Sequence, residues 1–293
     1  MTDILIGTSG FDYPEWKGVF YPADLKRQEF LEYYATQFNG LEINNTFYRM
    51  PDSMRLRNFY ERTEGRLQFS IKANRGLTHE IEKEWKKTAE TFRFNILPLL
   101  QKEALSAVLF QFPQSFHYTP ENRFYLADLI KEFDGYPVCV EFRHKDWIKE
   151  SVFEGLEKRK ASIVFCDMPM CHLAQMSIIS NYANGAERSM PKLKYLLDGT
   201  ACRTPFIGPS AYLRMHGRNS GAWYDSGDTP NGSGRYDYFY SEEELESFVP
   251  VIQAAQGEGK KVQAFFNNHP RGSGAKNAAQ LKDILDKIIK IKS

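Results

Sequence analysis

The sequence is poor in paired cysteines and in excess charge. Its four cysteines, Cys139, Cys166, Cys171 and Cys202, form no Cys-x-x-Cys pair, which argues against a zinc ribbon or a disulfide-rich secreted scaffold. The chain carries 38 basic and 37 acidic residues, a formal net charge of +1. So small a basic excess disfavours a general nucleic-acid or membrane-surface binder.

Long hydrophobic runs are also missing. No stretch approaches the ~18 apolar residues of a membrane span, and the first ten residues, "MTDILIGTSG", lack the charged start and apolar core of a signal peptide. We therefore expect a cytoplasmic protein with reduced thiols and no membrane partner. The sequence leaves the oligomeric state open.

What the sequence does contain is a regular alternation of strand and helix patterns. The predicted strands are near-continuous apolar runs, which are typical of parallel strands covered on both faces; they span 4–9, 41–47, 67–73, 107–112, 138–143, 162–167, 211–217 and 261–268. Amphipathic helical patterns lie between them. Ser241 and Glu244 form a capping box ahead of one such helix, which Pro250 should bend or shorten.

This alternation predicts the fold class. Eight strands separated by helices, with no glycine-rich fingerprint after the first strand, favour an α/β protein with a (β/α)8 TIM-type barrel in a single domain, residues 1–293. An open doubly wound sheet is the alternative. Two segments are expected to stand out from the barrel: a long connection at 168–206 and a glycine-rich loop at 217–240.

Polar and ionisable residues end all eight predicted strands. Because the carboxyl ends of barrel strands surround one mouth, these side chains should share a site there. We predict three catalytic residues: Lys72, Glu141 and Asp167. The predicted substrate-binding residues are the other strand-end residues and two aromatic residues of the loop 10–22, namely Glu42, Asn44, Asn45, Gln111, Arg143, Arg214, His216, Asn267, Asn268, Tyr13 and Trp16.

The residue types suggest individual roles. Glu141 suits general acid or base work, and Lys72 suits an electrophilic donor. Arg143 and Arg214 suit the capture of a carboxylate or phosphate. The structural alternative is that Glu141–Arg143 or Glu42–Arg214 are ion pairs that close the top of the core.

The aromatic residues and the metal question have alternatives as well. Tyr13 and Trp16 would line the site, or instead form a hydrophobic lid packed on neighbouring helices. No cofactor is predicted and no residue is assigned to a metal, because no close cluster of histidines and carboxylates is present. The alternative is a divalent metal at the barrel mouth, for which Glu141 and His216 are among the residues of suitable type.

Several stretches resemble a known family. They are "IGTSGFDYPEWKGVFYP", "FNGLEINNTFYRMP", "FSIKANRGLTH", "LFQFPQSF", "VEFRHKDW", "RMHGR", "YDYFYSEEEL" and "FFNNHPRGSGAKNA". In this order, from about residue 3 to 285, they resemble the bacterial family catalogued as domain of unknown function seventy-two. The resemblance implies a single TIM-type barrel and brings no substrate. The segment 168–206 departs from the family pattern, since it is longer than the short connection expected there.

Three functional hypotheses follow. The first is an enzyme, with a hydrolase or lyase favoured, that does acid–base or hydrolytic chemistry on a small anionic, sugar-like molecule carrying phosphate or carboxylate. The second is binding or cleavage of nucleic-acid phosphodiesters, with arginines such as Arg49, Arg75 and Arg218 along the backbone; the near-neutral charge counts against it. The third is a barrel that binds a ligand without catalysis.

Overall fold

The architecture is given by a computed structural model, which describes residues 4–169, 206–221 and 234–292. Eight strands pair in chain order and close into a parallel (β/α)8 barrel, as the sequence predicts. The strands are β1 (Leu5–Ser9), β2 (Gly40–Ile43), β3 (Gln68–Lys72), β4 (Leu105–Gln111), β5 (Val138–Glu141), β6 (Ser162–Asp167), β7 (Ser210–Met215) and β8 (Lys261–Phe266). Most of the predicted connection at 168–206, and residues 222–233 of the glycine-rich loop, lie outside the described residues.

Within the described residues, helices lie between successive strands at every connection except that from β6 to β7. The helices are α1 (Phe30–Gln37), α2 (Ser53–Arg62), α3 (Trp85–Gln101), α4 (Pro120–Glu132), α5 (Glu150–Lys158), α9 (Glu242–Glu246), α10 (Val249–Gly257) and α11 (Ser273–Lys292), with short 3-10 helices between them: η1 (Pro14–Trp16), η2 (Arg27–Glu29), η3 (Asn45–Phe47), η4 (Arg75–Leu77), η5 (Lys145–Trp147) and η8 (Pro270–Gly272). The predicted capping box is present, because Ser241 and Glu244 bond reciprocally through side chain and backbone. Pro250 lies in the first turn of α10, so the predicted single helix is two.

The second strand is shorter than predicted. The pattern 41–47 suggested a strand through Phe47, but β2 ends at Ile43 and η3 follows. The Thr46 hydroxyl donates to the carbonyls of Ile43 at 3.1 Å and Lys72 at 2.6 Å. These side-chain bonds, one within the turn and one to the neighbouring strand β3, satisfy carbonyl groups that a longer β2 would have used, so the chain turns at this point.

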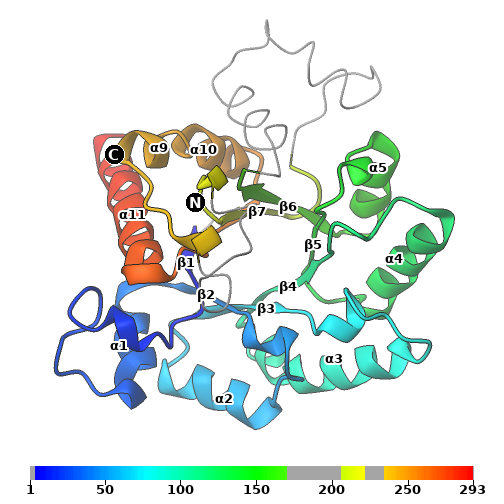
Figure 1. Ribbon diagram of the computed structural model, residues 1–293, viewed down its shortest axis with the longest axis horizontal. Helices are drawn as coiled ribbons and strands as arrows, with labels where there is room; N and C mark the ends of the chain where they lie inside the picture. Colours follow the sequence, from blue (N-terminus) through cyan, green and yellow to red (C-terminus); the bar gives the residue numbers. More distant parts are fainter. Residues whose placement is uncertain (1–3, 170–205, 222–233, 293) are drawn as a thin grey trace, which may run out of the picture. The chain divides into compact units, whose positions relative to one another are not determined.

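The chain divides into two compact units, and the division passes through β2, β6 and β7. Among the described residues, unit 1 comprises 4–41, 165–169, 213–221 and 234–292, and unit 2 comprises 42–164 and 206–212. In unit 2, β3, β4 and β5 pair in parallel, and α2 to α5 lie outside these strands (Figure 1). All seven residues of β4 are buried, as expected for a strand covered on both faces.

In unit 1, β1 pairs with β8, and α10 and α11 pack against this pair. The start of the barrel requires a glycine. A Cβ atom at Gly7 would lie 1.9 Å from the carbonyl oxygen of Gly40. The Tyr34 hydroxyl joins the same two strands, because it donates to the Gly40 carbonyl at 2.9 Å and accepts from the Thr8 amide at 2.8 Å.

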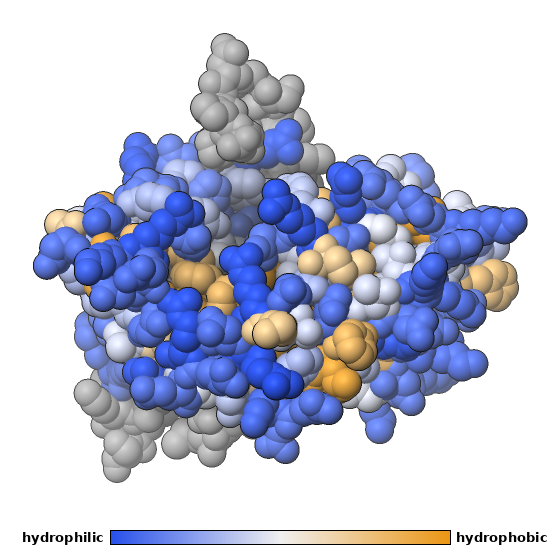
Figure 2. Space-filling model, turned by 90° about the horizontal axis from the view of Figure 1, so that it is seen from below, coloured by the Kyte–Doolittle hydropathy of each residue, from blue (hydrophilic) through white to orange (hydrophobic). Residues whose placement is uncertain are grey.

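The face drawn in Figure 2 is mainly polar. On this face (Figure 2), hydrophobic residues stand singly or in small groups among hydrophilic ones. None of the helices within the described residues is both long enough and apolar enough to cross a membrane.

Candidate functional site

In unit 2, the carboxyl ends of β3, β4 and β5 carry three of the predicted site residues. Lys72 ends β3, Gln111 ends β4 and Glu141 ends β5. Gln111 pairs with Glu141 in the parallel register. Its side-chain amide donates to the carbonyl of Phe112 at 3.0 Å, which fixes its orientation.

Glu141 and Arg143 form an ion pair. Arg143 Nη2 lies 2.5 Å from Glu141 Oε1, and the side chains are 17% and 0% exposed. Glu141 is therefore fully removed from water, while the arginine reaches the surface beyond the end of β5. Glu141 and Arg143 therefore do form the ion pair that the sequence analysis raised as a structural alternative. The guanidinium keeps further N–H donors for a ligand, because an arginine fork has more donors than one carboxylate uses.

The loop after β3 brings His79 to these charges. The imidazole is exposed at the surface, yet its surroundings lower its pKa to about 4; desolvation contributes most, followed by the positive charges of Lys72 and Arg143, while the charge of Glu141 acts in the opposite direction. Charges act on a titrating group in this way only at short range. Lys72, Arg143, Glu141 and His79 therefore form one group, called here the His79 cluster.

The orientation of the cluster is set by its neighbours. The Thr78 hydroxyl lies 2.9 Å from His79 Nδ1, and the ring of Phe47 meets that of His79 edge-on with 4.7 Å between centroids. Lys72 Nζ lies 4.4 Å from the centroid of the same phenylalanine ring. Phe47, from η3, thus contacts both the lysine and the histidine, which is a consequence of the early end of β2.

A buried hydrogen-bonded chain accompanies the cluster in unit 2. Tyr212 donates to Glu42 Oε2 at 2.7 Å, and its hydroxyl lies 2.6 Å from Ser70 Oγ. All three side chains are fully buried. Glu42, predicted to bind substrate, therefore has a fixed internal partner.

Two predicted asparagines follow β2. Asn44 is half-buried and Asn45 is exposed. Asn44 Oδ1 is a buried atom that accepts no hydrogen bond from any described residue. A buried acceptor without a donor is costly, so this oxygen is a candidate contact for a bound polar group.

In unit 1, Asp167 ends β6 within a network of polar side chains. Its carboxylate accepts from Arg218 Nε at 2.8 Å and from the Tyr240 hydroxyl at 2.8 Å. Burial and the Asp167 charge raise the pKa of Tyr240 well above its ordinary value. Burial by itself would lower the pKa of Arg218. The hydrogen bond and the negative charge of Asp167 outweigh this effect and raise the pKa of Arg218.

This network continues to helix α9. Arg218 Nη1 donates to Glu244 Oε1 at 2.9 Å, and the Tyr238 hydroxyl donates to the same oxygen at 2.7 Å. Burial and the bond to Glu244 raise the pKa of Tyr238 to about 12. Asp167, predicted to be catalytic, is thus held by two donors in a position that also suits a structural role.

Two side chains of ligand type lie close together in unit 1. Cys166 and His216 offer ligand atoms within 4.8 Å of one another. The Asn267 amide lies 3.0 Å from His216 Nδ1. If this amide donates, the ring proton sits on Nε2, which disfavours a metal ligand at that atom. Sulfur and imidazole donors would otherwise suit zinc.

The other predicted residues of unit 1 are mostly buried. Arg214 is 1% exposed and Asn268 is fully buried. Asn268 Oδ1 accepts no hydrogen bond from any described residue, while its amide donates to the Tyr236 carbonyl at 3.4 Å. As with Asn44, the uncompensated oxygen is a candidate contact for a bound molecule.

The loop 10–22 behaves largely as a packed aromatic cluster. Trp16 is fully buried, and its indole donates to the His269 carbonyl at 2.8 Å, so the packing alternative applies to it. Tyr13 donates to the Ser9 carbonyl at 2.8 Å and stacks on the His269 ring at 5.0 Å. Burial lowers the pKa of His269.

Sequence reasoning missed His79. It lies at the end of the stretch "FSIKANRGLTH", seven positions after Lys72. A histidine in the loop that follows a charged strand end is a signal that could have identified it. Arg218 was considered only as a phosphate contact, although it is the ion-pair partner of Asp167.

Fold and strand-end residues define the class of this protein: a (β/α)8 barrel that carries charged and polar side chains at the carboxyl ends of its strands. The chain matches the family model described as "Protein of unknown function DUF72" over residues 5–292. It belongs to that family, and the resemblance noted in its sequence is confirmed.

Individual relatives agree with this assignment. The chain is 27% identical over 276 residues to the UPF0759 protein YunF of Bacillus subtilis (strain 168), covering 91% of this chain and 90% of the relative. A crystal structure of a DUF72 family protein from Thermotoga maritima MSB8 is 32% identical, with a TM-score of 0.76 over 97% of this chain and 100% of that one. Another, from Enterococcus faecalis V583, is 21% identical, with a TM-score of 0.74 over 97% and 96%.

Proposed function

We propose that this protein is an enzyme that does acid–base chemistry on a small anionic substrate, a sugar-like molecule carrying phosphate or carboxylate. The proposed centre is the His79 cluster. The family is uncharacterised, so the proposal depends on the side chains of this chain alone.

One observation carries the proposal. The ring of Phe47 contacts both the Lys72 ammonium and the His79 imidazole. The ion pair of Arg143 and Glu141 lies at the end of β5, and its charges act on the same imidazole. With His79 neutral, two cations face one carboxylate, so the cluster has a net positive charge. Such a cluster attracts an anion, and the fork of Arg143 suits a carboxylate or phosphate group. An ion pair that served only to fill the core would need neither Lys72 nor His79 beside it.

Each member of the cluster receives a role. Arg143 and Lys72 bind the anionic group, and Glu141 gives or takes the proton. His79 is neutral at pH 7, because its pKa is lowered to about 4. When Thr78 donates to Nδ1, the ring proton sits on Nε2, from which it can donate a hydrogen bond to a substrate oxygen. A neutral imidazole used as a donor is an established way to polarise a carbonyl group.

Further contacts would orient the substrate. Asn44 Oδ1 would accept from a substrate hydroxyl, which would compensate its buried oxygen. In unit 2 we retain the other predicted residues as contacts of this substrate: Glu42, Asn45 and Gln111. The predicted residues of unit 1 are retained as proposals for that unit by itself: Asp167, Arg214, His216, Asn267, Asn268, Tyr13 and Trp16. The internal bonds of Glu42 and Asp167 make them positioning residues for their surroundings, and the buried Trp16 supports the loop.

The test is a ligand screen followed by product analysis. Phosphorylated and carboxylated sugars are added to the purified chain, thermal stabilisation is measured, and each stabilising compound is incubated and analysed by NMR. For a compound that is turned over, Glu141→Gln should lower kcat by at least about a hundredfold, and Lys72→Met should raise KM. Lys131→Met, an exposed lysine of α4, is the matched control and should change neither.

The outcomes separate the alternatives. Turnover that survives Glu141→Gln in a folded protein contradicts the catalytic assignment. Stabilisation without any product would identify a ligand-binding barrel instead. Circular dichroism of each variant distinguishes loss of chemistry from loss of structure.

A further inference from the structure

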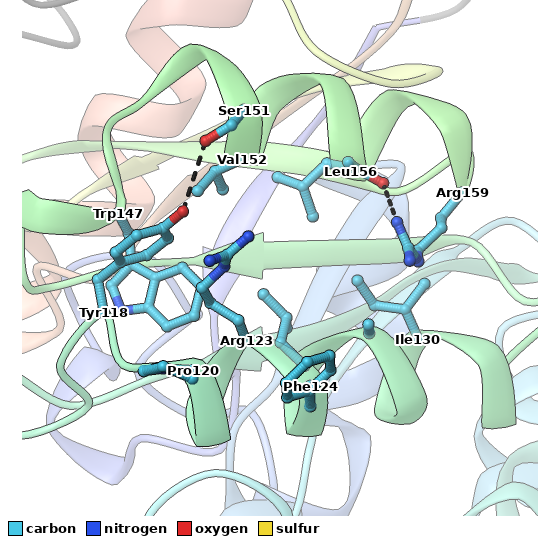
Figure 3. Close-up of a pocket in the computed structure, with 13 residues that line it drawn as sticks. Tyr118, Pro120, Arg123, Phe124, Ile130, Trp147, Ser151, Val152, Leu156 and Arg159 are labelled. Atoms are coloured by element: carbon cyan, nitrogen blue, oxygen red, sulfur yellow. Dashed lines mark hydrogen bonds between the residues drawn. The ribbon is translucent and has the colours of Figure 1, made fainter.

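A groove runs between helices α4 and α5 in unit 2, on different residues from those of the His79 cluster. It has a volume of about 270 Å³ and is lined by residues 118–130 of α4 and its entry and by residues 147–159 of η5, α5 and its exit. We call it the α4–α5 groove. Figure 3 shows the facing side chains of the two helices and the indole of Trp147 at one end.

The floor of the groove is apolar. Leu126 and Ile130 from α4, and Val152 and Leu156 from α5, are buried, as is Trp147. The indole N–H of Trp147 already donates to the Phe116 carbonyl at 2.7 Å. The indole also stacks on the rings of Phe116 and Phe142, with 5.1 and 4.7 Å between centroids, and it is 1% exposed. It therefore closes one end of the groove and leaves no free ring face for a ligand.

Cations stand at both ends of this floor. Arg123 lies 5.1 Å from the centre of the Tyr118 ring, and Lys149 Nζ lies 4.3 Å from the same centre. At the other end, Arg159 Nη1 donates to the carbonyl of Gly155 at 2.9 Å. Within the described residues, no ion pair with a carboxylate is seen for Arg123, Lys149 or Arg159. The groove thus combines apolar surface with uncompensated positive charge.

One further residue argues for an occupant. Phe124 lines the groove from α4, and it is 73% exposed. Gly155 gives the facing side of α5 no side chain, so the two helices leave open space between them. A Cβ atom at Gly155 would meet nothing closer than Arg159 Nη1, at 3.7 Å.

We propose that the α4–α5 groove is a second binding site, which takes a small molecule that joins one apolar ring to a carboxylate or phosphate group. The volume lies just below the ~300–1,000 Å³ of ordinary ligand pockets, so it admits one ring and its acidic group rather than a larger ligand. The ring lies against the exposed ring of Phe124 and the aliphatic floor. The acidic group is bound by Arg123, or by Arg159 when the ligand lies in the opposite direction.

The test uses three probes that each carry one phenyl ring and differ in charge; 3-phenylpropionate and 3-phenylpropanol are matched in length. Phenyl phosphate and 3-phenylpropionate are the anionic probes, and 3-phenylpropanol is the neutral one. Dissociation constants are measured by ligand-observed NMR on the intact chain. We expect the anions to bind at least about tenfold more tightly than the alcohol, since a charge-assisted hydrogen bond contributes that much.

Three variants locate the binding. The double variant Arg123→Gln with Arg159→Gln should weaken both anions about tenfold and leave the alcohol unchanged. Gly155→Leu should block all three probes, because the new side chain fills the groove. Lys72→Met, in the His79 cluster, should leave the three dissociation constants unchanged.

Several results would overturn the proposal. They are equal affinity for acids and alcohol, anion binding that survives the double arginine variant, or anion binding lost in Lys72→Met, which would place the probe in the His79 cluster. Both arginines are exposed, so their replacement should leave the fold intact, and circular dichroism verifies this. If Gly155→Leu fails to fold, the arginine variant alone decides.

Discussion

Arg143 Nη2 lies 2.5 Å from Oε1 of Glu141, and the carboxylate of this pair is fully buried. A buried carboxylate that loses its cation is left with the full cost of desolvation. We expect Arg143→Ala to lower the free energy of unfolding by about 3 kcal/mol, measured by chemical denaturation. Adding Glu141→Gln to this variant should restore most of the loss. A cost of less than about 1 kcal/mol for the single variant would mean that water compensates Glu141.

The ionisation of His79 provides a second prediction. Its pKa should be about 4 in the folded chain, against an ordinary value of 6.5, and NMR titration of the imidazole protons measures it. Lys72→Met should raise this pKa, because the variant removes a positive charge that opposes protonation. Lys131→Met, which removes a lysine that is not among the charges acting on His79, should leave the pKa unchanged. If the pKa of His79 were unchanged in Lys72→Met, Lys72 would not belong to the His79 cluster.

The same shift has a consequence for stability. Between pH 6.5 and 4 the unfolded chain binds a proton at His79 that the folded chain does not bind. The contribution of this residue to stability is therefore complete above pH 6.5 and decreases as the pH falls to 4. Because the side chain is exposed, solvent screening limits the effect to less than about 1 kcal/mol. Denaturation of His79→Gln at both pH values should show a smaller decrease than the unaltered chain.

The buried chain of Ser70, Tyr212 and Glu42 provides another test. Tyr212→Phe removes the hydroxyl that donates to Glu42 at 2.7 Å, and the buried carboxylate then lacks this donor. We expect a loss of about 1–3 kcal/mol in the free energy of unfolding. The double variant with Glu42→Gln should lose less than the sum of the two single variants, because both act on one bond. Strict additivity would show that the bond contributes nothing.

The approach of β1 to β2 depends on a missing side chain. Gly7→Ala would place a Cβ atom 1.9 Å from the Gly40 carbonyl oxygen. The strands would have to separate, at a cost of at least about 2 kcal/mol, with a matching fall in melting temperature. Gly257→Ala in α10 is the control: nothing lies within 4 Å of the new atom, and the variant should stabilise the chain by ~0.5–1 kcal/mol. Equal melting temperatures for Gly7→Ala and Gly257→Ala would contradict the close approach of β1 to the Gly40 carbonyl.

The sequence was most informative about the barrel strands. Continuous apolar runs such as "SIVFCD" identified β6 with its observed bounds, Ser162–Asp167, because a strand covered on both faces must be apolar throughout. The end of β2 was wrong by four residues. "LEINNTF" keeps the composition of a strand, and only the bonds from Thr46 to carbonyls as distant as that of Lys72 make it turn. Such tertiary bonds are not encoded in local periodicity.

The sequence predicted which charged residues end the strands, but not which side chains from the loops contact them. Strand ends identified Lys72 and Glu141, since the position of a strand end follows from the strand itself. His79 was missed because it reaches the charges through a loop, and loop paths depend on contacts such as that of Phe47. Trp16 was interpreted as a residue of the site or of a lid, and its burial could not be deduced from a loop rich in aromatic residues.

Glu244 links the start of a helix to the end of a strand. One of its carboxylate oxygens caps α9 through the Ser241 amide, while the other accepts from Arg218, which in turn holds Asp167 at the end of β6. Unwinding the first turn of α9 would therefore release the guanidinium, and with it one of the two donors that restrain Asp167. A movement of α9 would therefore change the contacts of Asp167, because Glu244 binds both the start of the helix and Arg218.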